Sequence, residues 1–371
     1  MAGKNRRKPF AKSAWAAIFL FPLLLFPFST TFSQDLVLKR PDSMAVEDLL
    51  QKAFDFSYIS PDSSMQYATA ALSKALERRD IGQTARAHEL KADAHWEAKE
   101  HEEALREYSM AYWYCWGQRD DYKLALILQQ MSRIYIEQGR YTEGRIALEE
   151  AIHIGKGLQD PGLLSRLYHA MGNLLHILGQ DQEGIQYHRQ SLRINQARDH
   201  QPAISANYNN LGNLYMALGQ LDSALSYYRA ALKIKKELGN PRGIILTKAN
   251  IGNVLNEMDS LEKAEVVLRE ALRDGQRQGL KTWATTAKIN LADNFRRQRR
   301  YAASIDLFND SLTDSIPPSP HEKVVIYDNL AMIYEEQGVQ VVDVDALRPQ
   351  AFDELEQAIE GVDVGPHLGQ L

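Results

Sequence analysis

Several kinds of chemistry are missing from this 371-residue chain. It has a single cysteine, Cys115, so no disulfide can form within it and no thiolate pair can hold a metal. It also lacks a glycine-rich phosphate loop, a His-Glu-x-x-His pair and a nucleophile elbow. Asp343 and Asp345 stand close together, but without the spacing of a calcium loop. We therefore predict no metal, no other cofactor and no enzymatic activity.

Positive charge is also scarce. The chain holds 43 Lys and Arg against 48 Asp and Glu, and five of the basic residues lie within positions 1–33, which contain no acidic residue. Binding to nucleic acid depends on the neutralisation of phosphates, so we do not expect a nucleic-acid partner. The basic run from Arg296 to Arg300 is short, and we interpret it as a solvated helix end that suits the helix dipole.

Long apolar runs are absent except near the N-terminus. Basic residues, a mostly apolar run over 14–28 and small polar residues follow one another there, which is the order of a secretory signal peptide. We predict that residues 1–33 are removed by cleavage between Ser33 and Gln34, and that the product is periplasmic or extracellular. An uncleaved anchor is the alternative, but the run is short for a membrane span and contains two prolines. No membrane span is expected after cleavage.

What the sequence does contain is a 40-residue period of small residues. One series reads Ala104, Gly144, Gly184, Ala224, Ala264 and Ser304, and a second reads Gly172, Gly212 and Gly252. A fixed period of this size is typical of a solenoid, in which each unit buries its apolar face against its neighbours. We therefore predict one repeating architecture along most of the chain.

Each unit is predicted to be a pair of antiparallel helices. In the clearest unit, apolar residues recur at helical intervals from Ile204 to Leu218 and again from Leu221 to Ile234. Gly219 is placed to end the first helix, and Gly239-Asn240-Pro241 marks the turn to the next unit.

The same unit carries a specific resemblance. Asn210-Leu211-Gly212, Tyr215, Leu218-Gly219, Ala224, Tyr228 and Ala231 resemble the tetratricopeptide repeat. That repeat usually has about 34 residues, and the longer unit is similar to the repeats of kinesin light chains and of Leu-Gly-Asn repeat scaffolds. The resemblance implies an all-α fold, a right-handed α-solenoid superhelix of about eight antiparallel helix–turn–helix units, which binds proteins.

The resemblance covers residues 45–360, after a short linker at 34–44. The first repeat is degenerate, and the last is predicted to carry an insertion near 339–349. Residues 361–371 are too few for another helix pair, so we expect a flexible tail.

Tetratricopeptide repeats line their inner face mainly with first helices, and the residue after the Leu-Gly pair often contacts an extended peptide. Here that position holds Asn173, Asn213 and Asn253, which we call the Asn ladder, flanked by Arg133 and Asp293. Each Asn offers a donor and an acceptor to a peptide main chain. The alternative is that these residues only follow the repeat consensus. The other candidates for the same groove are Arg166, His169, His176, Asn209 and Asn256.

An aromatic run in the second repeat offers a different surface. Tyr108, Tyr112 and Tyr114 fall on consensus core positions, whereas Trp96 and Trp113 do not. Tryptophan is enriched at binding hot spots, so these two residues are predicted as an aromatic interface.

Two functions remain open. The first is an exported scaffold, without enzymatic activity, that holds a peptide or an extended segment of another protein in the groove. The second is a stand-alone or truncated sensory arm of a signal-transduction protein of the histidine kinase or transcriptional regulator type. The sequence does not identify the partner.

Overall fold

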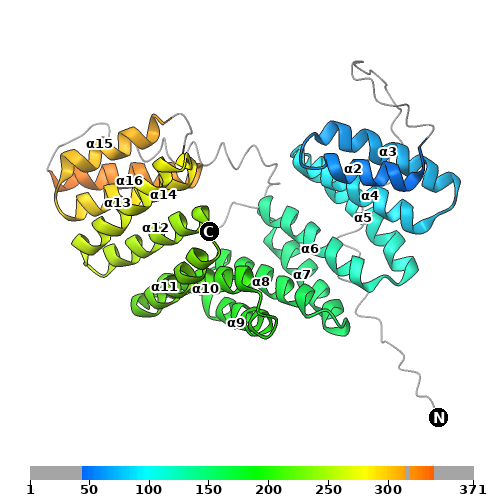
Figure 1. Cartoon of the computed structure of the whole chain (residues 1–371), viewed down its shortest axis with the longest axis horizontal. Helices are drawn as coiled ribbons and strands as arrows, with labels where there is room; N and C mark the ends of the chain where they lie inside the picture. The colour runs from blue at the N-terminus through cyan, green and yellow to red at the C-terminus, as the bar shows by residue number, and fades with distance from the viewer. Residues whose placement is uncertain (1–43, 315–317, 338–371) are drawn as a thin grey trace, which may run out of the picture. The chain divides into compact units, whose positions relative to one another are not determined.

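The computed structural model describes residues 44–314 and 318–337, which form 15 α-helices and no strand (Figure 1). The helices fall into two compact units that meet in sequence between Asp120 and Asp121, and each is described by itself. Unit 1 contains α2 (Val46–Phe56), α3 (Pro61–Glu77), α4 (Ile81–Glu97) and α5 (His101–Gln118). Unit 2 contains α6 (Asp121–Glu137), α7 (Tyr141–Gly157), α8 (Pro161–Ile177), α9 (Asp181–Ala197), α10 (Gln201–Ala217), α11 (Leu221–Glu237), α12 (Pro241–Glu257), α13 (Leu261–Arg277), α14 (Lys281–Arg297), α15 (Tyr301–Leu312) and α16 (Pro320–Glu336).

The period of the sequence is the length of one helix pair. The helices α10 and α11 have 17 residues each. Three residues separate α10 from α11 and three separate α11 from α12, which accounts for the 40-residue spacing. Seven pairs follow one another, and α16 is the first helix of an eighth. The prediction of an all-α solenoid built from helix pairs is confirmed.

The connections after α3–α6 and α8–α14 are short because each of these helices ends in a left-handed residue. Gly219 has a φ of +70°, and the next residue, Gln220, donates its backbone N–H to Tyr215 O at 2.8 Å, five residues back. Asp259 takes the same position with a φ of +55° although it has a Cβ atom. At the predicted turn between units, the Asn240 side chain accepts from Gly243 N at 3.0 Å and so caps α12.

The glycine series lets the two helices of a pair approach closely. A Cβ atom on Gly212 would lie 2.7 Å from the ring of Tyr228 on α11. Gly172 lies in the same way under the ring of His188, and Gly252 under Leu268. A side chain larger than hydrogen at these positions would displace the residue that covers it.

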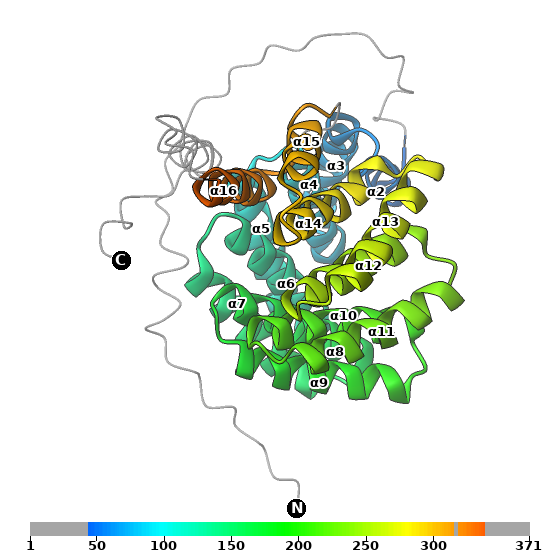
Figure 2. The ribbon, with the colours of Figure 1, turned by 90° about the vertical axis from the view of Figure 1, so that its left-hand side faces the viewer.

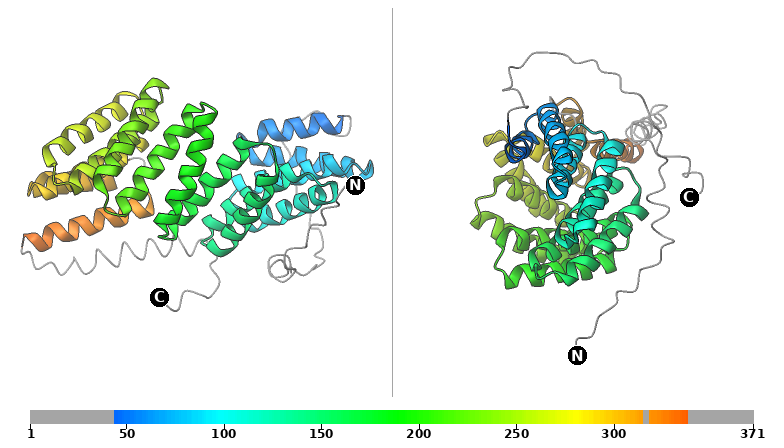
Figure 3. Two further views of the ribbon diagram at one scale, coloured as in Figure 1. Left: turned by 90° about the horizontal axis from the view of Figure 1, so that it is seen from below. Right: turned by 90° about the vertical axis from the view of Figure 1, so that its right-hand side faces the viewer.

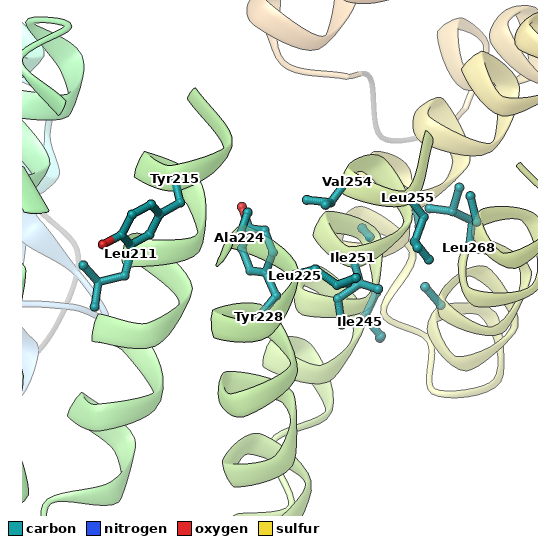
Figure 4. Close-up of a cluster of buried hydrophobic side chains, with 14 of the residues drawn as sticks. Leu211, Tyr215, Ala224, Leu225, Tyr228, Ile245, Ile251, Val254, Leu255 and Leu268 are labelled. Atoms are coloured by element: carbon teal, nitrogen blue, oxygen red, sulfur yellow. The ribbon is translucent and has the colours of Figure 1, made fainter. Parts of the chain in front are cut away.

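The core runs continuously from one pair to the next. In Figure 4, Leu211 and Tyr215 on α10 and Tyr228 on α11 belong to one buried cluster with Ile251 on α12 and Leu268 on α13. Tyr228 is 1% exposed, so its ring is packed on all sides while its hydroxyl reaches a polar partner described below. Neighbouring pairs of this part of unit 2 therefore bury their apolar faces against each other, as expected of a solenoid.

Within unit 2, the first helix of each pair lies on the inner side of a curved stack and the second helix on the outer side. Figure 2 shows this arrangement for α10, α12 and α14 against α11 and α13, and Figure 3 shows the stack from two further directions. We call the exposed surface of α6, α8, α10, α12 and α14 the inner face.

Some predictions concern residues outside those described: the signal peptide at 1–33, nearly all of the linker at 34–44, the insertion near 339–349 and the tail at 361–371. A single continuous array from 45 to 360 stays a prediction. Cys115 is buried on α5, with 1% of its surface exposed.

Candidate functional site

Side chains of neighbouring first helices meet on the inner face of unit 2. Asn210 Nδ2 on α10 donates to Asn173 Oδ1 on α8 at 2.7 Å and lies 3.3 Å from His169 Nε2. Asn253 Nδ2 on α12 lies 3.9 Å from Met216 Sδ on α10. These contacts place the positions of the Asn ladder on one surface that crosses several repeats.

The three members of the Asn ladder differ in exposure and in partners. Asn173 is exposed, whereas Asn213 and Asn253 are half-buried. Asn213 Oδ1 accepts a hydrogen bond of 2.6 Å from the hydroxyl of Tyr228, which reaches it from the second helix. The equivalent pair in unit 1 is Tyr108 and Asp93, where the tyrosine hydroxyl also donates. Because a carboxylate only accepts, this repeated pair supports the tyrosine as the donor in both units.

Basic side chains extend the ladder. Arg133 on α6 and Arg166 on α8 are both exposed. Arg166 lies three residues before His169 and seven before Asn173, so the three residues share one face of α8. His176 also lies on α8, and its Nδ1 is 2.6 Å from Asp181 Oδ1 at the start of α9. Arg166 and His176 therefore flank Asn173 in sequence on α8, and Arg133 holds the equivalent position on α6.

Four further predicted site residues are also held in contacts within the protein. Asn256 is 1% exposed. Its Nδ2 donates to Asn290 O at 3.0 Å, and its Oδ1 accepts from Asn294 Nδ2 at 2.7 Å. Asn209 Oδ1 accepts from Lys235 at 3.2 Å and from Thr247 at 3.3 Å, both beyond its own helix. Asp293 pairs with Arg296 and Arg297 at 2.7 and 2.8 Å. His169, the fourth, belongs to a buried network.

That network contains residues that the sequence did not single out. His188 on α9 is 1% exposed and lies edge-on to His169, with 5.1 Å between ring centroids. The Nδ1 atoms of His169 and His188 lie 3.3 and 3.4 Å from the same acceptor, Asn207 Oδ1. Asn207 Nδ2 in turn donates to Ser191 Oγ at 3.1 Å. A polar network thus joins α8, α9 and α10 beneath the inner face.

Burial sets the charge state of both histidines. Loss of solvent lowers the pKa of His188 to about 3, and the neighbouring His169 adds to this effect. Burial also lowers the pKa of His169, against the opposing hydrogen bond to Asn207. Both imidazoles are therefore neutral near neutral pH. The sequence offered one signal for this network. His188 occupies the repeat position that holds Tyr228 one unit later and Leu268 two units later, so a histidine stands where a core residue is expected.

The basic run at the end of α14 is exposed at Arg299 and Arg300, but its arginines also form ion pairs. Arg297 pairs with Asp293 at 2.8 Å and with Glu257 of the preceding repeat at 2.5 Å. Arg300 pairs with Glu265 at 3.0 Å, and its guanidinium lies 4.0 Å from the ring centroid of Phe295. These arginines join repeats because acidic side chains of the neighbouring helices lie within reach.

The two tryptophans of the predicted aromatic interface are separated by their burial. Trp96 is 8% exposed and packs on His101, with 5.3 Å between the ring centroids. Trp113 is 50% exposed on α5 and meets Trp116 edge-on at 5.9 Å. Only the Trp113 side of the prediction lies on the surface of unit 1, and Trp116 joins it there.

Within 44–314 and 318–337, no three His, Cys, Asp or Glu side chains are grouped so that they could hold a metal ion. In the same part of the chain, every helix is too short or too polar to cross a bilayer. What the inner face does offer is a row of amides and guanidinium groups on rigid helices.

Family models described as tetratricopeptide repeat match residues 66–120, 125–154 and 163–237. No curated protein sequence matches this chain significantly.

Solved structures show the same fold at low sequence identity. BtubC (BKLC) from P. vanneervenii is 20% identical with a TM-score of 0.53, over 64% of this chain and 93% of that chain. The apo form of RapI is 14% identical with a TM-score of 0.66, over 86% and 88% of the two chains. The Rap conjugation gene regulator of plasmid pLS20, solved in complex with the Phr* peptide, is 18% identical with a TM-score of 0.55, over 88% and 98%.

Matches to the repeat models lie in both units, and the helix pairs repeat with the period of the sequence. The neighbours found among solved structures share this architecture. The chain is therefore a tetratricopeptide-repeat protein.

Proposed function

We propose that this protein is an exported scaffold without enzymatic activity, which binds a peptide or an extended segment of another protein on the inner face of unit 2. The observation that carries the proposal is the Asn ladder on neighbouring first helices, with Asn173 exposed and Asn210 bonded to it. Amide side chains pair with main-chain groups of a ligand whatever its sequence. Rigid helices hold them in place, which lowers the entropy lost on binding.

The structural comparisons support a peptide as the class of ligand. The Rap regulator of similar fold was solved with a bound peptide, and an array of helix pairs presents a long surface rather than an enclosed pocket. No cofactor is part of this proposal.

Export rests on the N-terminal pattern. The basic, apolar and small-residue order over 1–33 supports removal of this segment between Ser33 and Gln34. The mature protein would then be periplasmic or extracellular, without a membrane span. N-terminal sequencing of the protein from the envelope fraction tests this part, because a first residue other than Gln34 contradicts the proposed cleavage.

A sensory arm is the second candidate. It is favoured by the similarity to a gene regulator that binds a peptide. In that case peptide binding would change the activity of a histidine kinase or a transcriptional regulator. Reconstitution with a histidine kinase or transcriptional regulator encoded beside this protein distinguishes the sensory arm from the scaffold. A scaffold leaves the activity of that kinase or regulator unchanged when peptide is added.

Selection of displayed random peptides on the immobilised chain tests the groove. We expect peptides that bind the natural protein and are lost with Asn173→Ala plus Asn253→Ala. Asn309→Ala is the matched control, because Asn309 is exposed on the second helix α15. Equal binding to all three proteins places the binding surface elsewhere.

A further inference from the structure

Acidic residues avoid the centre of the inner face. The first helices α8 and α10 contain no Asp or Glu over their 17 residues each, although the chain as a whole has more acidic than basic residues. α12 contains only Glu257, at its last position. The second helices of the same repeats carry acidic residues beside basic ones, with Asp181 and Glu183 on α9 and Asp222 and Glu237 on α11. The exposed surface of α8 and α10 therefore carries no carboxylate that would repel an acidic ligand.

The amides on this surface present mainly donors. The oxygen of Asn173 is taken by Asn210 at 2.7 Å, and the oxygen of Asn213 by Tyr228 at 2.6 Å. Their Nδ2 groups donate to no described residue, so each amide offers N–H to a ligand. Asn210 keeps its oxygen, which can accept a peptide N–H.

The same surface also carries a positively charged side chain. Arg166 is exposed, shares a face of α8 with Asn173, and forms no ion pair within the described ranges. Arg133 occupies the position equivalent to Asn173 on α6. Ile177, one turn beyond Asn173, is 52% exposed. The surface therefore combines a guanidinium group, amide donors and one apolar contact.

We propose that the inner face over α8 and α10 binds an acidic extended segment, whose carboxylates face Arg166 and the amide N–H groups of Asn173 and Asn213. This inference rests on the proposed function and adds the chemistry of the partner. Charge-assisted hydrogen bonds to carboxylate are stronger than those between neutral groups, so the acidic side chains supply most of the selectivity. Asn210 Oδ1 fixes the main chain beside them.

Three variants, Arg166→Glu, Asn173→Asp and Asn213→Asp, test the proposal with the same displayed peptides. Selection on the natural protein enriches Asp and Glu, and Arg166→Glu abolishes that enrichment. Arg229→Glu is the matched control, because Arg229 is exposed on the second helix α11 without an ion pair among the described residues. Asn173→Asp and Asn213→Asp keep the oxygen that Asn210 or Tyr228 needs but remove the N–H donors.

A selected peptide is then compared with a copy in which Asn and Gln replace Asp and Glu. Fluorescence anisotropy should give about tenfold weaker binding for the neutral copy, and a similar loss for each Asn→Asp variant with the acidic peptide. Peptides that depend on Asn173 but show no acidic enrichment overturn this inference and leave the proposed function standing. Peptides that ignore every inner-face variant overturn both.

Discussion

A buried lysine between repeats offers the sharpest test of the energetics. Lys235 on α11 is 9% exposed, and its ammonium group donates to Thr247 Oγ1 at 2.7 Å and to Asn209 Oδ1 at 3.2 Å. Neither partner carries a charge. Burial without a counter-ion lowers the pKa of Lys235 from 10.5 to about 8. We predict that Lys235→Met stabilises the protein at neutral pH.

The magnitude follows from that pKa. Charging the buried amine costs about 3 kcal/mol more than charging it in the unfolded chain. Methionine removes this cost but loses two hydrogen bonds, each contributing about 1 kcal/mol. Thr247 and Asn209 still bond each other at 3.3 Å, so neither is stranded. The free energy of unfolding should therefore rise by about 1 kcal/mol at pH 7.

The sign depends on pH. Between about pH 8 and 10.5 the unfolded chain binds a proton at Lys235 that the folded chain does not, so the natural protein gains stability as the pH rises. The advantage of Lys235→Met should shrink over this range and then reverse. Urea unfolding followed by circular dichroism at a series of pH values measures it.

The neighbouring Lys236 supplies the control, since it is exposed on the same helix. Lys236→Met should change stability little at any pH. An equal gain from both variants, or a gain from Lys235→Met that does not vary with pH, would refute the reasoning.

Three further predictions concern backbone and acid stability. Gly212→Ala should lower the free energy of unfolding by about 1–3 kcal/mol, because the new Cβ atom would lie 2.7 Å from the ring of Tyr228. Gly117→Ala is the control and should not lower it, since a Cβ atom there has nothing within 4 Å. Thermal unfolding compares the two variants. The natural protein should lose stability as the pH falls from about 6.5 towards 3, because the unfolded chain protonates His188 first; His188→Leu should reduce this loss in acid titrations followed by circular dichroism. Asp259→Gly should raise the free energy of unfolding by up to about 1 kcal/mol, because it relieves a left-handed residue with a Cβ atom; urea unfolding measures it.

Most of the fold could be predicted because it depends on spacing. Two helices and two short connections fix the period, and Gly219 and Asn240 act through local backbone chemistry that the sequence displays directly. The close approach at Gly212 was equally readable, since a small residue recurs at the same register.

The site was harder to predict because the type of a residue does not show whether its side chain points to the surface or into a neighbouring helix. Asn253 and Asn256 are three residues apart on α12, yet one stays half-buried at the inner face and the other is 1% exposed. Trp96 shows the same difficulty, as its packing on His101 depends on a neighbouring helix. Lys235 occupies a repeat position that is otherwise Ala75, Cys115, Gly155, Asn195 and Gly275, a contrast that marks it as unusual but does not give its partners.

The polar contacts between repeats give each unit a fixed place in the order. Asn207 meets Ser191 where repeat five follows four, Thr247 meets Lys235 at the next boundary, and Asn294 meets Asn256 at the one after. Removing exactly one unit would keep every backbone turn, yet it would set side chains against partners they did not match. The order of these repeats is therefore fixed by matched side chains at their junctions as well as by the backbone turns.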